Sequence, residues 1–351
     1  MKRIIGLFMA FSVMLFALTG CTAAGEISQA AGNEQGGSQA AGDKKLSIVT
    51  TIFPEYDWVK ELLGERAADC EITMLLDNGV DLHSYQPTAA DILKISSCDM
   101  FIYVGGESDK WVEDALAETG RNDIAVINLL DVLGDKVKAE EIVEGMEHEH
   151  EDADEDHDHE EGEEHDHDHD HEEELDEHVW LSLNNTEAIC DEIASQLVKL
   201  DPGNADLYNS NLNAYKEKLS DLDAQYKAAV DGASVKTLLF GDRFPFRYLT
   251  EDYGLSYYAA FAGCSAESEA SFETIVFLAD KTDELGLSAI MTIEGKDHRI
   301  AETVRDNTKN KDQQILTLDS MQATTSKDVE AGTTYYSIMS DNLEVLKEAL
   351  K

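Results

Sequence analysis

The stretch NADLYNSNLNAYKEKLSDLDAQYKAAVDG, residues 204–232, decides the fold. Its apolar side chains recur at intervals of three to five residues, at Leu207, Leu212, Tyr215, Leu219, Leu222 and Tyr226. This spacing predicts an α-helix of about seven turns with one apolar face. A helix of that length is unusual within one globular domain. We therefore expect it to connect two lobes.

Short apolar runs alternate with helix-like segments on both sides of this helix. Before it, helical segments separate strands predicted over 45–53, 70–76, 99–105 and 124–129. After it, helical segments separate strands predicted over 235–240, 255–261, 288–293 and 314–318. Strands that alternate with helices form parallel sheets. The sequence thus predicts an α/β fold of two lobes, each a parallel sheet flanked by helices, joined by a long rigid helix.

The predicted segments divide the chain into lobes and an insert. The N-terminal lobe spans 46–146 and continues over 178–203, and an acidic insert interrupts it at 147–177. The connecting helix covers 204–232, and the C-terminal lobe covers 233–351. Two lobes of this size can each bury a core, and the cleft between them is the expected ligand site.

The chain begins with features of an exported protein. Residues 1–20 combine two basic residues with an apolar run, which is typical of a signal peptide. The run ends in LTGC, which resembles a bacterial lipobox with Cys21 as the lipidated residue. Residues 21–45 are rich in Gly, Ala, Ser and Gln and predict a flexible tether. We expect an extracytoplasmic protein that is anchored to the membrane through lipid on Cys21.

The insert at 147–177 carries much of the negative charge. Its almost exclusive Asp, Glu and His content leaves no apolar side chains for a core, so we expect it to be disordered. Histidines among carboxylates form weak transition-metal sites. Eight lie here: His148, His150, His157, His159, His165, His167, His169 and His171. The net charge of −46 excludes nucleic acid as a partner, because the chain cannot neutralise phosphates.

Outside the insert the chain has three histidines, His83, His178 and His298. His83 follows a predicted strand, where open α/β sheets bind ligands, and His178 precedes a helix. A single loop histidine is more often solvated or a helix cap than a metal ligand. Two at such positions favour a metal site without deciding it.

Four segments together resemble the zinc/manganese solute-binding lipoproteins of ABC importers, the ZnuA/AdcA-like group. DLHSYQPTAADI (81–92) and DEHVWLSLNN (176–185) are similar to the two histidine motifs of that family. Leu82 and Glu177 stand where the family usually has proline. MTIEGKDHRIAETV (291–304) resembles the acidic-ligand loop, and GTTYYSIMSDNLEVLKEAL (332–350) resembles the closing helix. The resemblance implies two α/β lobes, a rigid connecting helix and a metal ion held between the lobes.

Carried over by position, the resemblance implies metal ligands at His83, His178 and Glu294. The family's third ligand falls on Arg243, which cannot bind a cation. Asp242, one residue earlier, could supply this ligand if the loop shifts, and His298 is the alternative. We favour Asp242. Either choice gives a four-coordinate shell of the kind that zinc adopts.

Histidine ligands favour Zn²⁺, whereas an aspartate in place of histidine moves the shell toward Mn²⁺. We expect Zn²⁺ as the cargo, captured by a monomer that feeds an ABC permease. A manganese-specific binding protein of the same family is one alternative. A surface zinc buffer or adhesin without a transport role is another.

We do not expect an enzyme, since the sequence contains no HExxH or GxSxG motif. Four further cysteines, Cys70, Cys98, Cys190 and Cys264, show no CxxC spacing. Their pattern fits disulfide pairs and free buried thiols equally well.

Overall fold

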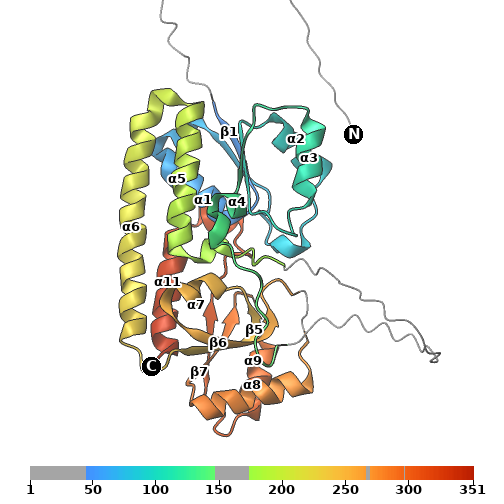
Figure 1. The fold of residues 1–351 in the computed structure, drawn as a ribbon, viewed down its shortest axis with the longest axis vertical. Coiled ribbons are helices and arrows are strands. Elements are labelled where there is room, and N and C mark those ends of the chain that lie inside the picture. Colours follow the sequence, from blue (N-terminus) through green and yellow to red (C-terminus); the bar gives the residue numbers. More distant parts are fainter. Residues whose placement is uncertain (1–44, 147–173, 266–268, 296) are drawn as a thin grey trace, which may run out of the picture. The chain divides into compact units, whose positions relative to one another are not determined.

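The computed structural model describes residues 45–146, 174–265, 269–295 and 297–351. Its N-terminal lobe contains a parallel sheet in the strand order β2-β1-β3-β4. The strands are β1 (Ser47–Thr50), β2 (Glu71–Met74), β3 (Met100–Tyr103) and β4 (Ala125–Asn128). The helices are α1 (Phe53–Leu63), α2 (Ala89–Ser97), α3 (Trp111–Thr119), α4 (Leu129–Leu133) and α5 (Leu183–Leu200). Figure 1 shows α2 and α3 on one side of this sheet and α1 and α5 on the other.

Local sequence signals set the ends of these helices. Pro54 lies in the first turn of α1. A backbone N–H there has no partner within the helix, so proline, which lacks the N–H, costs no hydrogen bond. Gly64 ends the helix with a φ of 55°. This backbone conformation is strained for residues with a Cβ but not for glycine. At α2, Thr88 and Asp91 form the predicted capping box, in which each side chain accepts from the other's backbone N–H.

The C-terminal lobe repeats the topology of the first. Its parallel sheet has the order β6-β5-β7-β8, so in both lobes the first strand lies between the second and the third. The strands are β5 (Thr237–Phe244), β6 (Ser256–Ala262), β7 (Ala289–Ile293) and β8 (Gln314–Leu318). The helices are α7 (Arg247–Tyr253), α8 (Phe272–Leu285), α9 (Arg299–Asn307), α10 (Ser326–Glu330) and α11 (Tyr335–Ala349). The predicted fold class is confirmed.

The predicted long helix is α6 (Ala205–Asp231), with 27 residues. It packs against α1 and α5 of the first lobe and against α7 and α11 of the second, and it runs along both lobes in Figure 1. Most of the predicted apolar face is buried, namely Tyr215, Leu219, Leu222 and Tyr226. Leu207 and Leu212 are half-buried. The helix therefore contributes core to both lobes.

One continuous hydrophobic core extends through both lobes. It includes Trp58 of α1, Tyr226 of α6 and Tyr335 of α11, all fully buried. A smaller core lies between the second sheet and α8 and α9. Close-packed interiors resist shear, so the shared core restricts rotation of one lobe against the other.

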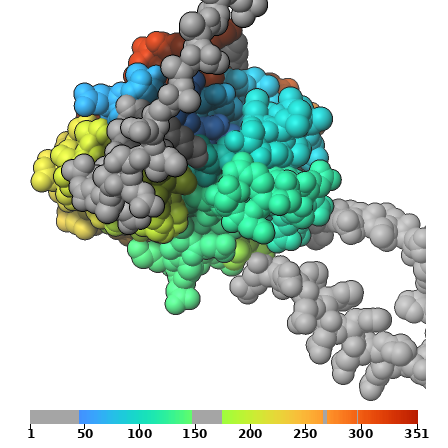
Figure 2. Space-filling view, turned by 90° about the horizontal axis from the view of Figure 1, so that it is seen from above, coloured from blue at the N-terminus to red at the C-terminus, as the bar shows by residue number. Residues whose placement is uncertain are grey.

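The outer face of the N-terminal lobe is seen in Figure 2. The region of α2 and α3, in cyan to green, lies to one side of this view, and the region of α5 and α6, in yellow-green, lies to the other.

Within the described residues, no helix is long and apolar enough to cross a membrane. The four cysteines Cys70, Cys98, Cys190 and Cys264 are free thiols.

Candidate metal centre between the lobes

His83 lies in a single 3₁₀ turn, Leu82–Ser84, that follows β2. The Asp81 carboxylate accepts a hydrogen bond from the His83 backbone N–H at 3.0 Å and so fixes the turn. On the ring, Nδ1 is 2.9 Å from Ser108 Oγ and 3.3 Å from Glu177 Oε2. Oxygen acceptors beside Nδ1 favour the tautomer that carries its proton there. Nε2 then keeps a lone pair for a metal.

His178 is fully buried at the entrance to a second 3₁₀ turn, Val179–Leu181. Asp176 Oδ1 accepts from the His178 backbone N–H at 2.9 Å and lies 3.0 Å from ring Nδ1. A carboxylate on Nδ1 again leaves Nε2 as the free donor atom. Trp180 packs beside the ring, with 5.3 Å between the ring centroids. The imidazole is thereby held in one orientation.

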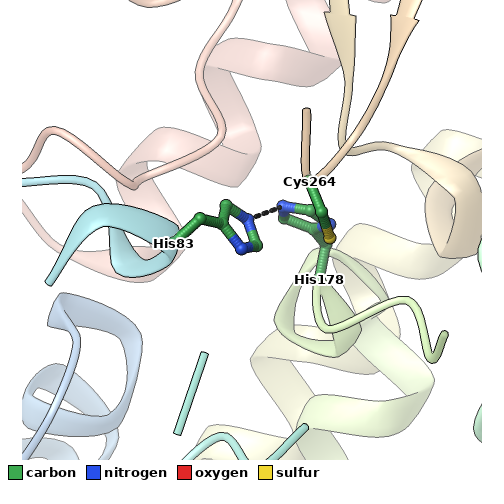
Figure 3. A group of neighbouring side chains, drawn as sticks. All are labelled: His83, His178 and Cys264. Carbon is green, nitrogen blue, oxygen red and sulfur yellow. Dashed lines mark hydrogen bonds between the residues drawn. The ribbon is translucent and has the colours of Figure 1, made fainter. Parts of the chain in front are cut away.

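The two imidazoles point at each other, as Figure 3 shows. Their Nε2 atoms are 3.2 Å apart. Two nitrogens bound to one tetrahedral zinc at about 2.0–2.1 Å would be about 3.4 Å apart. Without a shared proton or a cation, the two lone pairs repel. The spacing and the tautomers therefore suit a metal ion between the rings.

Cys264 completes a group of three potential ligands. One ring nitrogen of each histidine and the Cys264 sulfur all lie within 4.8 Å of one another. Within the part of the chain that the structure describes, this is the one such group of three or more His, Cys, Asp or Glu side chains. The cysteine follows β6 of the C-terminal lobe, whereas His83 follows β2 and His178 precedes α5, both of the first lobe. The donor atoms thus come from both lobes.

The backbone holds Cys264 close to the histidines. Its N–H donates to Glu140 Oε1 at 2.9 Å. The preceding Gly263 lies so close to His178 that a Cβ there would be 3.0 Å from Cε1 of the ring. Burial, followed by the negative charge of Glu140, raises the pKa of the Cys264 thiol. The thiol is therefore protonated in the metal-free protein at neutral pH.

Glu177, which replaces a proline of the family motif, has a clear structural role. It is almost fully buried, and its Oε1 accepts from the Ser108 backbone N–H at 2.9 Å. Burial raises its pKa, but hydrogen bonds from His83 and Ser108 outweigh burial, so the pKa lies below its ordinary value. Gly106 makes room for it, since a Cβ there would be 2.3 Å from Oε1. The ionised carboxylate fixes the His83 ring.

Three residues that the sequence analysis assigned to the shell lie outside this group. Asp242 accepts from the backbone N–H of Arg243 at 2.9 Å and of Ile293 at 3.3 Å. Glu294 accepts from the Ser320 N–H and hydroxyl, both at 2.7 Å. His298 is the N-cap residue of α9. Asp242 and Glu294 instead line a cleft of about 420 Å³.

Arg243 links the two lobes beside the metal centre. Its Nη2 donates to Asp81 Oδ2 at 2.6 Å, and both side chains are largely buried. Its Nη1 donates to the carbonyl oxygen of Ser265, the residue after Cys264, at 3.4 Å. The guanidinium also lowers the pKa of Asp81 against the opposing effect of burial. Arg243 thus connects the turn of His83 with the loop of Cys264.

The remaining assigned residues are not described by the structure. The eight insert histidines and Cys21 lie outside the described residues. The chain before and after residues 147–173 is joined by an antiparallel bridge between Ala139 and Leu175.

Asp176→Asn is expected to weaken zinc binding by about 10–100-fold, as changes in the partners of metal-binding histidines do. Asparagine can still accept from the His178 backbone N–H, so the turn should persist. Asparagine lacks the negative charge of aspartate, which makes the His178 imidazole a stronger electron-pair donor to the metal. Competition with a zinc chelator measures the loss. Asp191→Asn on α5, where the carboxylate binds Lys216 at the surface, is the control and should not change the affinity.

The chain resembles a known family and several known proteins. The family model of ZnuA, the periplasmic zinc-uptake complex component A, matches residues 48–349. The high-affinity zinc uptake system protein ZnuA of Bacillus subtilis is 30% identical over 338 residues, which cover 96% of this chain and 97% of the relative. The zinc-binding lipoprotein AdcA of Streptococcus pneumoniae is 29% identical over 313 residues, which cover 89% of this chain. This chain spans 57% of the length of that relative.

A solved structure shows the same fold. The Zn(II)-bound ZnuA-like domain of Streptococcus pneumoniae AdcA superposes with a TM-score of 0.66 at 25% identity. The match covers 88% of this chain and 99% of that domain. The chain belongs to the ZnuA family of periplasmic zinc-uptake components.

Proposed function

We propose that this protein captures Zn²⁺ between its two lobes, outside the cytoplasm, and delivers it to the permease of an ABC importer. One observation carries the proposal. The Nε2 atoms of His83 and His178 face each other at 3.2 Å, while oxygen acceptors occupy the Nδ1 side of both rings. This arrangement leaves two imidazole lone pairs directed at one point, and imidazole is a preferred zinc ligand.

Capture requires little movement of the lobes. The shared core and α6 restrict rotation, and the Arg243–Asp81 ion pair also joins the lobes. The ion enters a site whose ligands are largely in place, which reduces the ordering cost of binding. Release to the permease then requires only that the His83 turn or the Cys264 loop be displaced. The proposed role is transport of the ion as a monomer, without catalysis.

The cellular location follows from the N-terminal sequence and the family. The signal peptide at 1–20 and the lipobox at Cys21 support attachment to the outer face of a membrane through lipid.

Zinc retention by the purified protein during dialysis against a mild chelator tests the proposed capture. One zinc per chain is expected, and a wild-type protein that loses all of its zinc would refute the proposal.

Deleting residues 147–173 is expected to leave tight zinc binding within about threefold of the wild type, because the candidate ligands His83, His178 and Cys264 all lie outside this segment. The chain on either side is held by hydrogen bonds from Glu140 N–H to the Glu174 oxygen at 2.7 Å and from Asp176 N–H to the Lys138 oxygen at 2.8 Å. A short glycine linker should therefore preserve the site. Calorimetric titration with zinc should show fewer weak sites and one unchanged tight site. Loss of the tight site would show that the insert supplies a ligand.

A further inference from the structure

The position that the family resemblance assigns to the third ligand is occupied by a cation in this chain. Arg243 has no acceptor atom, and its guanidinium pairs with Asp81 of the opposite lobe at 2.6 Å. Moving it away would break this ion pair and still provide no donor for a metal. The C-terminal lobe must therefore contribute a different residue to the site.

The two carboxylates of the neighbouring cleft are engaged elsewhere. Asp242 accepts from two backbone N–H groups. Glu294 binds the segment after β8 through the Ser320 N–H and hydroxyl, with a further bond from Gln322 N–H at 3.0 Å. Neither carboxylate belongs to the group formed by His83, His178 and Cys264, and shifting either one toward the ion would strain these hydrogen bonds, whose loss is costly.

Cys264 has neither obstacle. Its sulfur already lies within 4.8 Å of the ring nitrogens of His83 and His178, and the cysteine is not in a disulfide. The glycine before it allows the loop to approach the His178 ring closely, and Glu140 holds the backbone N–H. These contacts hold the sulfur beside the two imidazoles.

We propose that the Cys264 thiolate is the third protein ligand, so that the site selects thiophilic ions such as Zn²⁺ and Cd²⁺ over Mn²⁺; this rests on the proposed function. On binding, the thiol releases its proton to solvent and the sulfur lone pair forms the metal bond. Sulfur donors favour soft and borderline ions, whereas Mn²⁺ prefers oxygen. The cysteine thereby makes the site more selective against Mn²⁺ than a carboxylate in that place would.

Co²⁺ is the spectroscopic probe for this ligand. Wild-type protein loaded with Co²⁺ should show a sulfur-to-cobalt charge-transfer band, which Cys264→Ser should lack and the matched control Cys70→Ser should retain. Cys264→Ser should also bind zinc at least about tenfold more weakly, since it removes one ligand. Cys264→His should restore zinc binding without the band and reduce the preference for Cd²⁺ over Zn²⁺.

The outcomes separate this inference from the proposed function. If Cys264→Ser keeps the charge-transfer band or the full zinc affinity while the wild type binds zinc, the thiolate is not a ligand and the capture function stands. If the wild type binds Mn²⁺ as tightly as Zn²⁺, the selectivity is refuted. If the wild type retains no zinc, the proposed function itself fails.

Discussion

His178→Ala is expected to weaken zinc binding by about 10²–10³-fold. Structural zinc sites contribute about 10–16 kcal/mol in total, so one of four ligands accounts for about 2.5–4 kcal/mol, and each 1.4 kcal/mol changes Kd tenfold. His83→Ala should have a similar effect, because its Nε2 faces the same point. Competition titration against a chelator of known affinity measures both losses.

His298→Ala is the matched control, since His298 is the remaining histidine outside the insert. It lies at the start of α9, outside the group of His83, His178 and Cys264. Zinc affinity should remain within about threefold of the wild type, as expected where no ligand is lost. A loss as large as that of His178→Ala would place His298 in the shell and contradict the proposed site.

Local sequence signals were sufficient to predict most of the fold. Strand β8 lies where the run QILTL predicts it, and α2 begins at the predicted capping box of Thr88. Strand β5 is longer than predicted and continues to Phe244. The pairing with β6 shifts register between Phe240 and Arg243, which is a β-bulge. A segment such as Gly-Asp-Arg, with a glycine and two charged residues, gives no sign that a strand continues through it.

The sequence pointed to two of the three residues that the structure groups together, and the reason is physical. His83 and His178 belong to recognisable motifs, and the structure brings them together. Cys264 belongs to no motif and has no CxxC partner, and its closeness to the histidines depends on how the two lobes pack. A usable signal was present: Cys264 follows a predicted strand of a parallel sheet, at the end where ligands bind, and Arg243 blocks the expected alternative.

Trp180→Ala is expected to lower the free energy of unfolding by about 3–5 kcal/mol, because it removes a large buried side chain and leaves a cavity. The indole is buried at the junction of the lobes, and its Nε1–H donates to the Ser320 carbonyl oxygen at 2.9 Å. The Tyr335 hydroxyl donates to the Trp180 carbonyl oxygen at 2.7 Å. Urea denaturation of the metal-free protein measures the change.

A second variant at this position separates the contributions of the indole, and an exposed aromatic residue serves as the control. Trp180→Phe keeps most of the apolar volume but leaves the buried Ser320 carbonyl without its donor, so a loss of about 1–3 kcal/mol is expected. Phe272→Ala removes an aromatic ring that is 73% exposed and should change stability by less than about 0.5 kcal/mol. If Trp180→Ala were as mild as Phe272→Ala, packing at Trp180 could not be what keeps the ligands in place. Zinc would then have to draw the lobes together itself, and its affinity would include that cost.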